Sequence, residues 1–187
     1  VELSKSLKSE TLLISIAAGK TTRFIEEKLS TNNPVVRVMP NTPAQIGKGV
    51  SAISGGSNAQ PAHLELTKEL FSASGVVVEL PEENQDAVTA LSGSGPAYFF
   101  YFIESMIKSG VQLGLTNEIA TQLAIGTIIG SAAMLQESGL DAATLRKNVT
   151  SPNGTTAAAL SVFADKDLEK IISDAMMAAK KRAQELA

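Results

Sequence analysis

Short apolar runs alternate with amphipathic stretches over the first 80 residues. Runs of strand type occupy residues 11–16, 34–39, 50–53 and 76–80, and stretches with helical spacing occupy residues 21–29 and 60–72. Strands that alternate with helices indicate βαβ units and a mainly parallel sheet with both faces covered. The pattern therefore predicts an α/β region over residues 1–80.

The pattern changes after Pro81, because residues 82–187 contain long Ala-rich helical stretches and no convincing strand. Residues 96–113 and 119–135 are apolar nearly all round, which is typical of deeply buried helices. A single subunit of this size has too few other elements to cover both, so a second subunit is the natural cover. We expect an all-α region over residues 81–187 that makes the protein an obligate dimer.

Residues 119–135 are shorter than the roughly 20 residues of a membrane span and include polar side chains such as Gln122, so we favour a buried helix packed closely through Gly126 and Gly130 over a span. Residues 165–186 predict one amphipathic helix. Its acidic start (Asp165, Asp167) and basic end suit the helix dipole.

Composition narrows the function classes. Of the 187 residues, 44% are apolar and 19% charged, which indicates a globular protein, and the net charge of −3 gives no basic footprint for nucleic acid. The absence of cysteine excludes disulfides, Cys-ligated metals and thiol catalysis, and the one histidine, His63, sits in a polar helical context typical of the surface. We expect no metal, and a cytoplasmic protein, because no signal peptide is present. The chain lacks an initiating Met, so we expect it to be part of a longer one.

Three loops could carry chemistry. Residues 39–44 (MPNTPA) directly follow a strand, where doubly wound folds bind ligands. Residues 91–98 (LSGSGPAY) run into a helix, so their backbone N–H groups could bind an anion, or Gly93 and Gly95 could serve only close packing. Residues 148–156 (NVTSPNGTT) form a turn before a helix whose first N–H groups suit a carboxylate, although a plain capping turn would look the same.

Together, the three loops closely resemble those of one family, pyrroline-5-carboxylate reductase. The matching stretches are residues 36–44, residues 86–98, and residues 149–152 with Gly154 and Thr156, in the family's order and spacing. The resemblance implies an oxidoreductase that uses NADPH or NADH to reduce a cyclic imine, 1-pyrroline-5-carboxylate, to L-proline in the last step of proline biosynthesis. It further implies the C-terminal part of a Rossmann domain over residues 1–80, a helical dimerisation domain over residues 81–187 with the active site between them, and dimers that assemble into larger rings.

The resemblance also implies roles for individual residues. Cofactor contacts fall on Ala18, Met39, Pro40, Asn41, Thr42 and Asn148. Substrate contacts fall on Glu82, Ser151, Gly154, Thr155 and Thr156, with Thr156 as the residue closest to the chemistry. Because the cofactor supplies the reducing equivalents, the protein needs mainly to orient the substrate and stabilise charge.

The chain departs from the family pattern in two places. The family's N-terminal glycine fingerprint is absent, so the preference between NADP and NAD is not encoded in these residues. Asn153 stands where the family has glycine, and since asparagine tolerates left-handed backbone we expect the turn to survive. Two alternatives remain open: a reductase of another imine or keto acid with the same architecture, and a dimerisation module without turnover.

Overall fold

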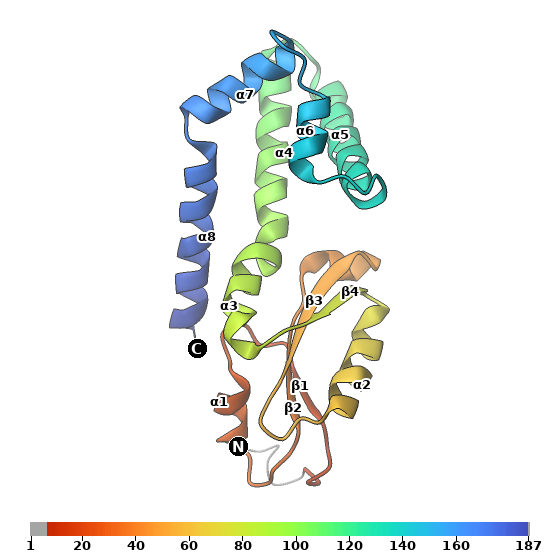
Figure 1. The fold of residues 1–187 in the computed structure, drawn as a ribbon, viewed down its shortest axis with the longest axis vertical. Helices are drawn as coiled ribbons and strands as arrows, with labels where there is room; N and C mark the ends of the chain where they lie inside the picture. Colours follow the sequence, from red (N-terminus) through yellow and green to blue (C-terminus); the bar gives the residue numbers. More distant parts are fainter. Residues whose placement is uncertain (1–6, 187) are drawn as a thin grey trace. The chain divides into compact units, whose positions relative to one another are not determined.

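The computed structural model describes residues 7–186 and divides into two compact units (Figure 1). Val1–Pro96 and Asp174–Ala187 make up the first, which we call the sheet unit, and Ala97–Ser173 make up the second, the helical unit. The expected order, an α/β region followed by an all-α region, is confirmed, and the described residues beyond 82 contain no strand. The units are defined by packing and not by order along the chain, so the part of the last helix from Asp174 onward belongs to the sheet unit.

The sheet has four strands in the order β1-β2-β3-β4, namely β1 (Leu13–Ser15), β2 (Val35–Met39), β3 (Gly49–Gly55) and β4 (Gly75–Glu79). The pairs β1–β2 and β3–β4 are parallel, as expected, and are connected through α1 (Thr22–Glu26) and α2 (Pro61–Ser72). The pair β2–β3 is antiparallel, which the sequence analysis did not foresee. Nine residues, most of them in the 3₁₀ helix η2 (Thr42–Ile46), connect these strands and are too few for a parallel crossover.

The core lies on one face of this sheet. Val36, Val38 and Ile53 are fully buried there, and Leu64 and Phe71 of α2 pack against them. Because successive side chains of a strand alternate between faces, Arg37 between these valines points to the opposite face. There it is only 2% exposed, beside η3 (Glu82–Asn84) and α3 (Gln85–Val88).

One point in the sheet requires glycine. Gly75 opens β4 with a φ of 141°, opposite Gly49 of β3. A side chain at Gly75 would overlap the main chain of Gly49, so the close approach of the two strands depends on this residue type.

Beyond α3 the chain is helical. A π-helical segment η4 (Thr89–Gly93) leads into α4 (Gly95–Gln112), and α5 (Asn117–Glu137), α6 (Ala142–Asn148), α7 (Thr155–Asp165) and α8 (Leu168–Glu185) follow. The single helix expected over residues 165–186 is wrong at its start. Asp165 ends α7, and Asp167 adopts a left-handed φ of 52°, which breaks the helix before α8.

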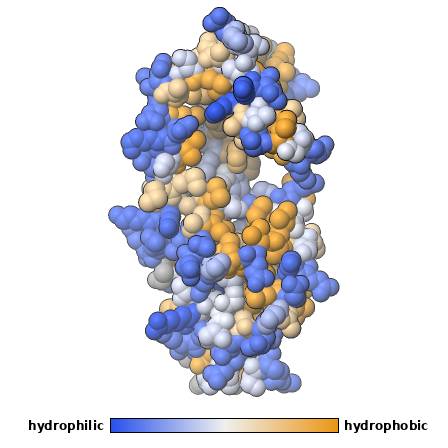
Figure 2. All heavy atoms as spheres, viewed as in Figure 1, coloured by the Kyte–Doolittle hydropathy of each residue, from blue (hydrophilic) through white to orange (hydrophobic). Residues whose placement is uncertain are grey.

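The two long apolar helices are not buried within this chain, as expected of helices that need a second subunit to cover them. Phe99, Phe100 and Tyr101 of α4 and Ile129 of α5 are all more than 60% exposed, and Figure 2 shows apolar side chains among the polar ones on the surface. The space around Gly126 and Gly130 is open, so neither glycine packs closely against another helix of this chain. Helices α4 and α5 instead approach each other at Gly110 and Ala120.

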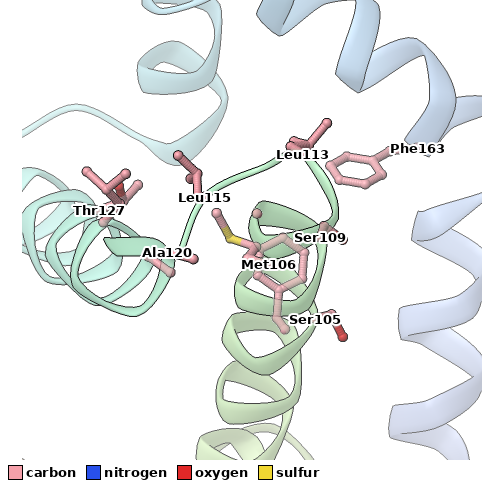
Figure 3. A pocket seen from close by; sticks show the side chains of 12 residues that line it. Ser105, Met106, Ser109, Leu113, Leu115, Ala120, Thr127 and Phe163 are labelled. Carbon is pink, nitrogen blue, oxygen red and sulfur yellow. The ribbon is translucent and has the colours of Figure 1, made fainter. Parts of the chain in front are cut away.

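An open pocket of about 470 Å³ lies among these helices in the helical unit (Figure 3). Its lining is mostly apolar and includes Met106 of α4, Leu113 just after α4, Ala120 of α5 and Phe163 of α7. By length and composition α5 could also cross a membrane, and little of it is covered inside the chain. The helical unit thus presents an uncovered apolar surface.

Candidate active site

The first two predicted cofactor segments lie at the same edge of the sheet. Ala18 follows β1 in an exposed turn, and residues 39–42 follow β2. Because β1 and β2 are parallel, their carboxyl ends meet at one edge, so the two segments are neighbours. This is where doubly wound sheets bind ligands, and a cofactor would fit against this edge.

Asn41 is held in place by its own side chain. Its amide oxygen accepts a hydrogen bond from the backbone N–H of Val50 at 2.8 Å, and its amide nitrogen donates to the main-chain oxygen of Ser92 at 3.3 Å. The side chain therefore fixes the loop against both β3 and η4. Thr42, by contrast, is exposed, and opens η2 with Pro43 next to it.

The glycine-rich segment around Ser92 is not a loop of free N–H groups, contrary to one of the two interpretations above. Residues 89–93 form a π-helical turn, and the N–H of Ser94 donates to the Thr89 oxygen at 2.8 Å. Close packing explains Gly93, because a Cβ there would meet the end of the Met39 side chain at 2.6 Å, but the space around Gly95 is open. π-Helical turns occur frequently at functional sites, and this one supports the loop that contains Asn41.

Glu82 belongs to a charged cluster on the covered face of the sheet. Its two carboxylate oxygens accept hydrogen bonds from Thr22, one from the backbone N–H at 2.7 Å and one from the hydroxyl at 2.6 Å. Arg37 lies 3.5 Å from Glu82 and 3.6 Å from Asp86. A buried guanidinium requires such counter-charges, and the cluster joins β2, η3 and the start of α1.

The third segment forms the turn before α7. Asn153 adopts the left-handed backbone expected of it, with a φ of 57°. The N–H of Gly154 donates to the oxygen of Ser151 at 3.0 Å, which closes the turn. Gly154 is the N-cap and has no side chain to cap the helix, so the next N–H groups, at Thr155 and Thr156, point out of the helix end without a capping side chain. This end of α7 is suited to a carboxylate.

Helix α6 leads into this turn. Asn148 is the exposed last residue of α6, and the turn follows it directly. Asp141 caps the start of α6 by accepting from the N–H of Thr144 at 2.8 Å. That backbone hydrogen bond holds the pKa of the Asp141 carboxyl below its ordinary value.

The predicted site residues thus form two groups. Ala18, residues 39–42 and Glu82 lie in the sheet unit, whereas Asn148, Ser151 and residues 154–156 lie in the helical unit. Thr22 and Arg37, which hold Glu82, were not predicted from the sequence. A signal for Arg37 was present, since it is the one charged residue in the apolar run that forms β2.

A family comparison and a comparison with curated proteins match this chain to the same family. The family description "Pyrroline-5-carboxylate reductase dimerisation" matches residues 82–186. A pyrroline-5-carboxylate reductase from Pseudomonas aeruginosa is 44% identical over 186 residues, which cover 99% of this chain and 68% of the relative. The chain spans about two thirds of the length of such relatives.

Solved structures agree. A pyrroline-5-carboxylate reductase from Coxiella burnetii matches with a TM-score of 0.92 at 39% identity, over 100% of this chain and 70% of that one. The Plasmodium falciparum pyrroline carboxylate reductase, solved with NADP bound, matches with a TM-score of 0.90 at 33% identity, over 99% of this chain and 73% of that one. Both similarities extend across the sheet and the helices.

Proposed function

Because this chain belongs to the pyrroline-5-carboxylate reductase family, we propose that its protein reduces 1-pyrroline-5-carboxylate to L-proline with NADPH or NADH. The start of α7 carries this proposal, since it offers uncapped N–H groups and two threonine hydroxyls to an anionic substrate without any cationic side chain. A cyclic imino acid needs little more from the protein, because its nitrogen is itself basic.

The substrate carboxylate would bind at the turn before α7. The N–H groups of Thr155 and Thr156 would hold its oxygens, supported by Ser151 and Gly154 in the turn. The hydroxyl of Thr156 would then face the ring nitrogen and hold its proton in place. We assign Thr156 as the catalytic residue because a positioned proton donor is the one contribution to this reaction that a side chain must make.

The cofactor would bind along the carboxyl edge of β1 and β2. Ala18 and residues 39–42 lie along that edge in the sheet unit. The family resemblance adds Asn148, at the end of α6, as a further cofactor contact. When bound, the nicotinamide supplies the hydride for the reduction. The residues of the chain bind, orient and exclude water around it.

We further propose that the exposed apolar surface of α4, α5 and the pocket in Figure 3 is covered by a second copy of the chain. The family match to a dimerisation domain, which spans all of α4 and α5, supports a homodimer. On this proposal α5 packs against protein and not lipid, the protein is cytoplasmic, and dimers assemble further into rings. Cell fractionation shows where the protein resides, and size analysis gives the mass of its assembly. Recovery of the protein in the membrane fraction would contradict the proposal.

A proline auxotroph that lacks its own reductase tests the enzymatic proposal directly. The full-length protein should restore growth without proline, and the purified enzyme should oxidise NADPH or NADH only when 1-pyrroline-5-carboxylate is present. A panel of other cyclic imines and keto acids distinguishes the alternatives. Faster turnover of a panel member would indicate a different reductase, and no turnover of any would leave only the dimerisation module.

A further inference from the structure

Both carboxylate oxygens of Glu82 are engaged with Thr22, although 60 residues separate the two in sequence. Thr22 is the first residue of α1 and is only 4% exposed. Helix α1 has five residues, too few to be stable through its own hydrogen bonds. The Thr21 hydroxyl caps this helix by accepting from the N–H of Phe24, and the carboxylate ties its first residue, Thr22, to η3.

Arg37 lies beside Glu82 as its buried counter-charge. The guanidinium side chain is buried on the covered face of the sheet and lies within 3.6 Å of both Glu82 and Asp86. One of its terminal nitrogens, Nη2, has no hydrogen-bond partner within the described residues. A buried cation is stabilised by counter-charges beside it, so Arg37 helps to keep the Glu82 carboxylate at the place where it meets Thr22.

The segment held in this way is the turn between β1 and α1, residues 16–21, which contains Ala18. Its first end is fixed by the pairing of β1 with β2, and its second by the bonds of Thr22 to Glu82. Its middle lies against the C-terminal end of the chain, because Gly19 has room for no side chain beside Ala183 and Leu186. Residues 16–18 of the turn are exposed, whereas Gly19 is buried.

We propose that Glu82 is a positioning residue for the cofactor segment at Ala18 and not a contact of the substrate. The proposal rests on the reductase function proposed above. It reassigns one residue of that site, since a carboxylate that already accepts two hydrogen bonds and faces an arginine has little capacity left for a ring nitrogen. Glu82 thus acts through Thr22 on the affinity for NADPH.

The substitutions Glu82→Gln and Thr22→Val test this in the full-length enzyme. Each removes part of the link with little change in volume, and each should raise the KM for NADPH by about tenfold, the effect of one lost hydrogen bond to a charged group. The KM for 1-pyrroline-5-carboxylate should change less than twofold. Thr22→Ser keeps the hydroxyl and should retain the wild-type KM values. Glu83→Gln, at the exposed neighbour, should change neither KM. A raised KM for the imine with an unchanged KM for NADPH would overturn the proposal.

Amide hydrogen exchange provides a readout that does not depend on turnover. In the protein without ligands, Glu82→Gln should accelerate exchange in residues 16–22 at least tenfold and leave α2 unchanged. Uniform acceleration in both would show a merely structural role and overturn the proposal. If the wild-type protein reduces no imine, the proposed function fails while this measurement still decides whether Glu82 holds the turn. Thr22→Val serves in the same way if Glu82→Gln does not fold.

Discussion

The amide nitrogen of Asn41 lies 3.3 Å from the main-chain oxygen of Ser92, which joins the loop after β2 to the π-helical turn that precedes α4. The amide oxygen of the same residue accepts from Val50 at 2.8 Å. One side chain therefore connects three segments that the sequence separates by as much as 51 positions. Asparagine is suited to this because it offers a donor and an acceptor at once.

Replacing Asn41 should cost stability as well as cofactor affinity. Asn41→Ala leaves the Val50 N–H without its acceptor, and we expect a loss of about 1–3 kcal/mol in the free energy of unfolding. Asn41→Asp keeps the acceptor and loses only the donor, so its loss should be smaller. Urea unfolding curves of the two variants measure the difference, and equal stability of Asn41→Ala and wild type would contradict the assigned bonds.

Thr156 should matter for turnover more than for folding. Thr156→Ala in the full-length enzyme should lower kcat/KM by about 10²-fold, the lower half of the range for a positioned proton donor, because the imine is partly self-sufficient in protons. Thr156→Ser should keep most of the activity. Steady-state kinetics together with melting curves check this. A variant with normal kcat/KM and only a lowered Tm would reduce Thr156 to a structural residue at the start of α7.

The exposed face of α5 should control the oligomeric state. Ile129 is 63% exposed in the single chain, and Ile129→Lys places a charge in the interface that we propose there. We expect light scattering to show a dimer or larger assembly for the wild type and a shift toward monomer for the variant. Leu70→Lys, at a comparably exposed position of α2, is the control and should leave the mass unchanged.

Gly75 should be the least replaceable glycine of the sheet. Gly75→Ala meets both an unfavourable φ and the main chain of Gly49, so we expect a loss of about 3 kcal/mol or more. Gly139→Ala is the matched control, because its φ of 69° is also left-handed but the space around it is open. It should cost only about 1–2 kcal/mol. Similar losses in the two variants would show that β3 and β4 can separate freely at Gly75.

Acid should weaken the cap of α6. The pKa of Asp141 is lowered in the folded state by the hydrogen bond from Thr144, so the carboxylate contributes stability above its unfolded pKa of about 3.9. That contribution is lost as the pH falls from there through the lower folded pKa. Asp141→Asn keeps a capping group without the titration, so the stability difference between variant and wild type should change only in this acidic range, as measured by melting curves against pH.

Much of the fold could be predicted because it depends on local patterns. The runs that became β2 and α2 were found nearly to the residue, since β-branched runs and proline at a helix start act locally. Asn153 was also anticipated, because its backbone preference belongs to the residue itself. The direction of β3 was missed because it depends on the length of a connection and not on the strand.

The parts of the site that depend on distant contacts could not be predicted. Nothing in the residues around Thr22 indicates that Glu82 will accept hydrogen bonds from it. The cluster of Thr22, Glu82 and Arg37 forms only when the folded sheet brings Arg37 to the covered face. The resemblance supplied a list of site residues, but a list carries no information about which atoms are already engaged. Helices α4 and α5 show a similar limit, since their pattern revealed the need for cover while the cover itself lies outside one chain.

The uncovered apolar surface of α4 and α5 makes folding subject to mass action. If the folded subunit persists mainly when paired, each dilution shifts material toward the unpaired and less stable form. The Tm of this protein should then rise with its concentration. A substitution that is tolerated when the protein is abundant could therefore be lost to proteolysis when it is scarce, although the residue touches neither substrate nor cofactor.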